Sequence, residues 1–162
     1  MKLRNLRALF ALALLTAAGA VSAAPSHDYV MKFEGENALV EHTMRPTVSA
    51  AGEILEAAVG MHEYFREIQP TLSKKPYVDL VVNWTAMVRN QAGESMQAPA
   101  VQLRFKSDAL QKIKFSEVSP QGLLNEYVVN VGSSKLGKEM LMEFCEKYAQ
   151  TTPKFCQKAA RS

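Results

Sequence analysis

Histidine is the side chain most often used for acid–base chemistry near neutral pH, and the 162-residue chain has three of them. His27 lies in a polar N-terminal segment, while His42 and His62 each adjoin a glutamate without forming the helical H-E-x-x-H zinc pattern. His62 falls inside the apolar arc of a predicted helix, which favours a buried structural histidine. An acid–base role for His62 would require a cavity with Asp79 or Tyr127 nearby.

The serines also lack the sequence motif of a catalytic nucleophile. The run Val131-Gly132-Ser133-Ser134 has no second glycine of a G-x-S-x-G elbow, so its serines are interpreted as a turn and a helix cap. Asn83-Trp84-Thr85 is a formal glycosylation sequon, interpreted as accidental within a strand. The sequence therefore predicts no catalytic residue, no metal site and no cofactor, and favours a protein that is not an enzyme.

The two cysteines, Cys145 and Cys156, are the only pair the chain can form. Their separation of 11 residues suits a bridge between two short antiparallel helices and lacks the C-x-x-C spacing of a redox site. We therefore expect a structural disulfide, which agrees with export to an oxidising compartment.

Basic residues give the main binding hypothesis. Alternation predicts a hairpin in which Arg104 lies opposite Lys114 and Lys106 lies opposite Lys112, with Arg89 alongside. Like charges directly opposite each other destabilise a sheet, so this face is expected to attract an anionic partner. The alternative is that acids on neighbouring segments neutralise it or that the side chains splay into water.

Acidic residues supply both that neutralisation and a second candidate surface. Asp79 and Glu126 are the acids expected near the basic hairpin. The outer face of one predicted helix carries an acidic stripe, which is either a solvated face or a docking surface for a basic partner. The stripe consists of Glu53, Glu56, Glu63 and Glu67.

The first 23 residues have the three parts of a bacterial secretory signal peptide. A cationic start precedes an apolar run of about 14 residues and a small-residue end, Val21-Ser22-Ala23. We expect cleavage before Ala24, which leaves a periplasmic or secreted protein without a membrane anchor. An uncleaved amphipathic anchor is the alternative.

Cleavage changes the charge of the protein. Three of the 19 basic residues lie in the signal, so the mature chain has 16 basic and 16 acidic residues and no net charge. This balance argues against nucleic acid as a partner. Residues 24–70 carry eight acids and three bases, whereas residues 71–162 carry eight acids and 13 bases.

Hydrophobic periodicity predicts the elements that must position these residues. A spacing of three and four predicts an amphipathic helix over 47–69, and alternation predicts strands over 78–88, 101–106, 113–115 and 127–131. Pro99 is expected to delay the second of these strands. Helical spacing returns after Ser134, an expected N-cap, and Thr152-Pro153 is expected to start a last short helix.

These elements predict an α+β fold in which the amphipathic helix packs on a four-stranded antiparallel meander closed by a C-terminal helical hairpin. Residues 24–46 are expected to be weakly ordered, with a short strand at 29–33 and a helical turn at 37–44. The single domain is expected to span 47–162.

Charge separation and the lack of catalytic motifs favour an exported interaction protein that binds another protein through a sheet or helix face, such as an inhibitor, an immunity-type protein or an accessory factor. One alternative is a small-ligand module with a pocket between helix and sheet, lined by apolar residues such as Trp84 and Phe105. A less favoured alternative is a small hydrolase or isomerase that uses His62.

Overall fold

The computed structural model describes residues 29–162, so the predicted signal peptide lies outside the described residues. The chain forms a mixed α+β fold with the element order β1 (Tyr29–Glu34), β2 (Asn37–Thr43), α1 (Ala50–Leu72), β3 (Asp79–Arg89), β4 (Ser95–Lys106), α2 (Ser107–Lys112), α3 (Pro120–Tyr127), β5 (Val128–Ser133), α4 (Lys135–Tyr148) and α5 (Pro153–Ala159). None of the described helices is both long enough and apolar enough to cross a membrane.

The five strands form one sheet in the order β1-β2-β3-β4-β5. All neighbouring pairs are antiparallel except β2 and β3, which run parallel because α1 carries the chain from one to the other. The expected four-stranded antiparallel meander is therefore wrong in strand number and in this one pair, while the α+β class is confirmed.

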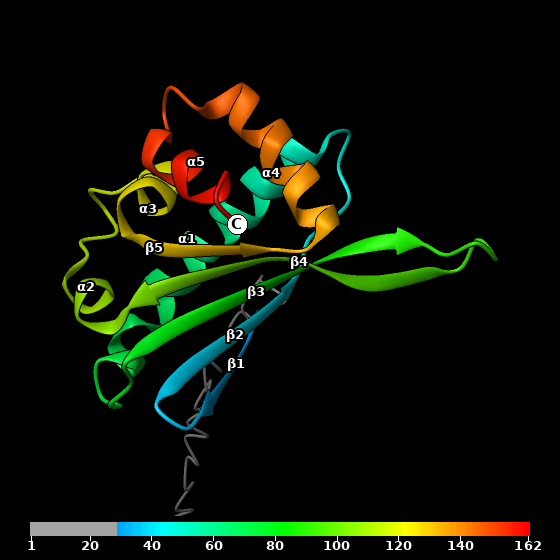
Figure 1. The fold of residues 1–162 in the computed structure, drawn as a ribbon. Helices are drawn as coiled ribbons and strands as arrows, with labels where there is room; N and C mark the ends of the chain where they lie inside the picture. The colour runs from blue at the N-terminus through cyan, green and yellow to red at the C-terminus, as the bar shows by residue number, and fades with distance from the viewer. Residues whose placement is uncertain (1–28) are drawn as a thin grey trace, which may run out of the picture.

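The helices gather on one side of this sheet, as Figure 1 shows. Alternate residues of β3 point toward them, and three of these, Leu80, Val82 and Trp84, are at most 1% exposed. They pack with the buried face of α1, which includes Ile54, Met61 and Phe65. Ser49 caps α1 by accepting a hydrogen bond from the Gly52 amide, and the helix continues one turn beyond the predicted end to include Pro70.

The C-terminal helical hairpin is confirmed, and the Cys145–Cys156 disulfide joins α4 to α5. Ser134 caps α4 as expected, since its hydroxyl oxygen accepts the Gly137 amide at 3.1 Å. Thr152 occupies the N-cap position of α5 as expected, but its hydroxyl donates to the carbonyl of Tyr148 instead of accepting an amide of the helix.

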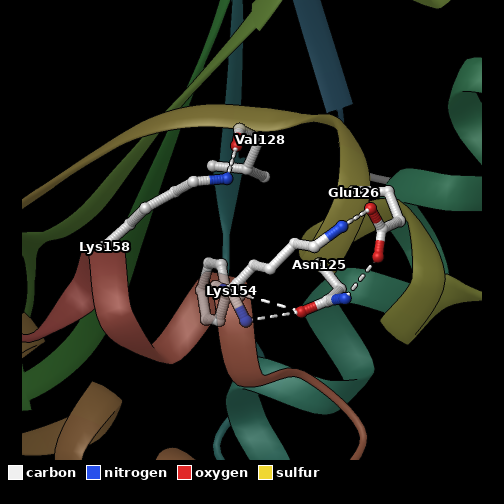
Figure 2. Close-up of polar contacts among 6 residues, drawn as sticks. Asn125, Glu126, Val128, Lys154 and Lys158 are labelled. Atoms are coloured by element: carbon white, nitrogen blue, oxygen red, sulfur yellow. Dashed lines mark hydrogen bonds and ion pairs between the residues drawn. The ribbon is translucent and has the colours of Figure 1, made fainter.

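The buried side chain of Asn125 from α3 caps α5 in place of Thr152. Its Oδ1 accepts the backbone amides of Lys154 and Phe155 at 2.9 and 3.4 Å, and its Nδ2 donates to Glu126 at 2.6 Å. Glu126 also pairs with the Lys154 ammonium, and the Lys158 ammonium donates to the carbonyl of Val128 (Figure 2). Helix α5 is thus held against α3 and β5 as well as by the disulfide.

Three segments differ from the predicted elements. Residues 37–44 contain β2 rather than a helical turn, and β1 and β2 form a paired hairpin where weak order was expected. Residues 107–112 form α2, and 113–115 form no strand although Ile113 and Phe115 are buried.

Pro99 lies within β4 instead of before it. It stands opposite Thr85 beside a register shift, where Ala100 is the extra residue of β4. Beyond this point β3 and β4 continue together as a two-stranded arm that projects past the rest of the sheet (Figure 1). We refer to Ala86–Arg89 and Ser95–Ala98, with the turn between them, as the hairpin arm.

Candidate functional site

The interior between α1 and the sheet is filled. Trp84, Phe105 and Phe115, which the ligand-module alternative would need around a hollow, are 1%, 0% and 6% exposed. His62 Nε2 lies 2.6 Å from the carbonyl oxygen of Val118, and its ring meets Phe115 edge to face. His62 thus contacts a backbone carbonyl and an aromatic ring, which agrees with its interpretation as a buried structural histidine.

The predicted hairpin of basic residues does not form. Arg104 and Lys106 lie on β4, but Lys112 ends α2 and Lys114 lies in the following loop, so neither stands opposite β4. The expected pairings are wrong because residues 107–112 turn into a helix. Arg89 lies on the hairpin arm, nine residues along β4 from Arg104, which corresponds to roughly 30 Å of strand.

Native acids contact three of these five cations, which agrees in part with the alternative left open by the sequence, although Glu126 pairs with Lys154 instead. Asp79 stands opposite Lys106 in the sheet, and its carboxylate lies 2.7 Å from the Lys106 ammonium and 3.1 Å from the Arg104 guanidinium. The contact with Lys106, followed by that with Arg104, holds the pKa of Asp79 below its ordinary value. Lys114 pairs with Glu117 at 3.3 Å. A role of these basic residues in binding a partner stays a prediction.

The predicted acidic stripe follows α1. Glu56 and Glu67 are exposed and Glu53 and Glu63 are partly buried. Desolvation raises the pKa of Glu53, while its hydrogen bond from the Thr47 amide opposes the rise and the nearby Glu143 adds to it. Because Glu143 also accepts the Ala51 amide at 3.2 Å, α4 covers part of this end of the stripe.

The opposite face of the sheet carries the site that sequence reasoning missed. In the part of the chain that the structure describes, no helix covers this face (Figure 1). Along the five-stranded part, three bases and three acids balance: Lys32, Arg104, Lys106, Glu34, Glu41 and Asp79. Arg89 adds one base on the hairpin arm, so the face is only weakly positive rather than strongly electropositive as expected.

One row of residues crosses all five strands of this open face. The register aligns Val30, Glu41, Asn83, Gln102 and Gly132, one from each strand in turn. All five line a groove of about 770 Å³, which lies within the range of ligand sites, about 300–1,000 Å³. The groove continues toward the base of the hairpin arm.

The lining of this groove combines apolar surface with polar groups that are almost all uncharged. Its hydroxyl and amide side chains include Thr43, Asn83, Thr85, Gln97 and Gln102. Its carboxylate, Glu41, is matched by Lys32 at 3.0 Å. The indole of Trp84 is buried, so it offers no exposed ring for stacking a sugar.

Asn83 and Gln102 stand side by side in the middle of the row. The Gln102 amide Nε2 donates to Asn83 Oδ1 at 2.9 Å. Among the described residues no further hydrogen bond engages Asn83 Nδ2 or Gln102 Oε1, which leaves one donor and one acceptor adjacent to each other. Exchanging the amide orientations of both side chains gives the same result, since one donor and one acceptor again remain.

The chain contained a partial signal for this site. Alternation in β3 and β4 predicts that Asn83 and Gln102 lie on the outer face. Their alignment with Glu41 and Gly132 depends on the parallel β2–β3 pair and on the extra residue at Ala100, which periodicity does not reveal.

Comparison with known proteins adds no assignment to this geometry. No protein-family model, curated protein or solved structure matches the chain.

Proposed function

We propose that the protein is an exported interaction protein that binds an extended segment of another polypeptide in the groove on the open face of its sheet. The observation that carries this proposal is the adjacent donor and acceptor left by Asn83 and Gln102. A peptide unit presents one carbonyl and one amide hydrogen, which is the complementary pair.

The rest of the groove supports this class of ligand. The groove is open to solvent along the sheet, and its neutral hydroxyl and amide side chains suit main-chain polar groups better than a phosphate or a carboxylate. The interior behind the sheet is filled, so the competing small-ligand pocket between helix and sheet has no corresponding space in the described residues.

Export is part of the proposal. The tripartite segment over residues 1–23 and the Cys145–Cys156 disulfide both fit a protein that works in an oxidising compartment outside the cytoplasm. In this setting an inhibitor, an immunity-type protein or an accessory factor would use the groove to hold its partner.

Panning a phage-displayed library of 12-residue peptides against the oxidised protein tests the proposal. Peptides that are enriched would be synthesised and titrated by calorimetry. Removing both amides with Asn83→Ala and Gln102→Ala should weaken binding about thirtyfold, because two hydrogen bonds of roughly 1 kcal/mol each are lost.

Asn130→Ala is the matched control, because Asn130 is an exposed asparagine on the same sheet face that does not line the groove. It should leave the affinity unchanged. Failure to enrich any peptide, or equal binding to the double variant and the unaltered protein, would contradict the proposal.

A further inference from the structure

The hairpin arm has two open strand edges. The β2–β3 register ends at Thr43 and Thr85, and the β4–β5 register begins at Val101 and Ser133. Within the described residues the arm strands thus pair only with each other, as the projecting green hairpin in Figure 1 shows. An isolated two-stranded hairpin is marginally stable in water, so an arm of this kind gains from a further strand.

The two edges differ in how well they can accept another strand. At the root of the β4 edge, Pro99 has no amide hydrogen, and the start of α4 occupies its carbonyl and that of Ala100 through Ser134 at 2.7 and 2.9 Å. On the β3 edge, the last contact is the Met44 amide on the Thr85 carbonyl at 2.8 Å. Inward of Gln97 the β4 edge thus offers no free backbone group to a partner strand, while the β3 edge is open from Ala86 onward.

Backbone alternation fixes which groups this edge presents. The Thr85 carbonyl points toward β2, so the amides and carbonyls of Met87 and Arg89 point the same way, out of the arm. The next residue agrees with this alternation, since the Asn90 amide points inward and donates to the Glu94 carbonyl at 3.0 Å. The edge thus presents two donors and two acceptors at two positions.

We propose that a second copy of this chain pairs with this edge, so that the two β3 arm strands run antiparallel about a two-fold axis at Val88. Met87 of each copy then lies opposite Arg89 of the other. Each such pair exchanges two hydrogen bonds, so the four outward groups of each arm are all used in four intermolecular bonds.

Neighbouring registers are worse for a second copy. Centring the axis on Met87 would place Arg89 opposite Thr85, whose carbonyl already accepts the Met44 amide. Centring it on Arg89 would place two guanidinium groups directly opposite each other, which is destabilising. The edge is thus self-complementary in one register, and this property identifies another copy as the occupant.

The same register completes an apolar surface. Val88 stands opposite Met96 within the arm, and Met96 is 49% exposed. The two-fold axis sets the two Val88 side chains next to each other, giving a row of Met96, Val88, Val88 and Met96 across four strands. This row continues the apolar alternation of Val82, Trp84 and Ala86 past the point where the helices cover it.

Proline substitution distinguishes pairing at the β3 edge from pairing at the β4 edge. Met87→Pro removes an outward amide from the β3 edge without removing a hydrogen bond between β3 and β4. Gln97→Pro is the matched control, because Gln97 stands opposite Met87 and its amide points out of the β4 edge. Sedimentation at about 100 μM should give twice the chain mass for the unaltered protein and Gln97→Pro, and one chain mass for Met87→Pro.

Cysteine substitution tests the register. Val88→Cys places two thiols opposite each other at the axis, at about 4.5 Å between Cα atoms, and should give a covalent dimer on oxidation. Met96→Cys is its control, because the two Met96 positions are separated by three strand spacings, about 14 Å, and should not cross-link. Peptide mapping distinguishes this bond from exchange with Cys145 or Cys156.

A protein that sediments as one chain at this concentration would overturn the proposal. So would a dimer that survives Met87→Pro, a dimer lost in Gln97→Pro alone, or a cross-link at Met96 but not at Val88. Far-UV circular dichroism and urea unfolding verify that each variant retains the fold, and the Val88→Cys cross-link tests the interface without any proline.

Discussion

Asn125 shows how much one buried polar side chain contributes to this fold. It is 8% exposed, and it satisfies two amide donors at the start of α5 while binding Glu126 on its own helix (Figure 2). Asn125→Ala should therefore lower the free energy of unfolding by about 1–3 kcal/mol, since buried donors lose their acceptor.

Urea denaturation followed by circular dichroism measures this change. Asn130→Ala removes the same side chain from an exposed position on β5 and should change the free energy by less than about 0.5 kcal/mol. Equal effects of the two substitutions would show that Asn125 does not act as the cap of α5.

Glu53 predicts a pH dependence at the start of α1. Desolvation raises its pKa in the folded protein, and Glu143 adds to this effect. The ionised carboxylate therefore costs stability. This cost is absent below the pKa of the unfolded chain and develops as the pH rises through the higher folded value.

Glu53→Gln should thus raise the melting temperature at pH 7 and have little effect near pH 3. Thermal melts at both pH values test this expectation, with Glu67→Gln, an exposed position on the same helix, as the control for charge alone. A stabilisation that is largest at pH 3 would contradict the assigned sign.

At the scale of elements, strong hydrophobic periodicity was sufficient to predict β3, α1 and α4 from the sequence. Short elements were harder, because Ile113 and Phe115 are buried at alternate positions in a loop and imitate a strand. Helix α3 did have a local signal: Ser119-Pro120 has the same cap-then-proline pattern that correctly predicted α5 from Thr152-Pro153.

The candidate site was less predictable than the elements. The outward faces of Asn83 and Gln102 follow from strand alternation, but the groove requires five strands in one register, and two of its strands come from a segment with weak periodicity. The predicted arrangement of unpaired basic residues was wrong for a related reason: Asp79 reaches Arg104 and Lys106 through strand pairing between positions distant in the chain.

The packing of α4 on β4 gives a prediction at this scale. A Cβ added to Gly137 would lie 1.9 Å from the carbonyl oxygen of Ala100, a contact that backbone cannot relieve without moving the helix. Gly137→Ala should therefore destabilise the protein by at least about 3 kcal/mol, although alanine favours helices over glycine.

Gly132→Ala is the matched control in urea unfolding, because its nearest contact would be an ordinary 3.7 Å to Gln102. A change below about 1 kcal/mol is expected there. Tolerance of alanine at Gly137 would mean that α4 does not approach β4 this closely.

At the scale of the whole molecule, the disulfide closes a short loop at the C-terminus. A loop of this size should contribute roughly 3 kcal/mol to the free energy of unfolding in the chain-entropy description. Dithiothreitol should lower the stability of the unaltered protein by this amount and leave the double variant Cys145→Ala, Cys156→Ala unaffected. Equal sensitivity to the reductant would show that the bridge does not constrain the unfolded chain.

The extra residue of β4 has a mechanical consequence. Ala100 lies at the root of the projecting arm, accepts the Ser134 amide at 2.9 Å and has the Gly137 backbone packed against its carbonyl. The base of the arm is thus in direct backbone contact with the first turn of α4. A partner that restrains the arm should therefore also restrain this turn. Hydrogen exchange at the first turn of α4 should slow whenever the tip of the arm is held.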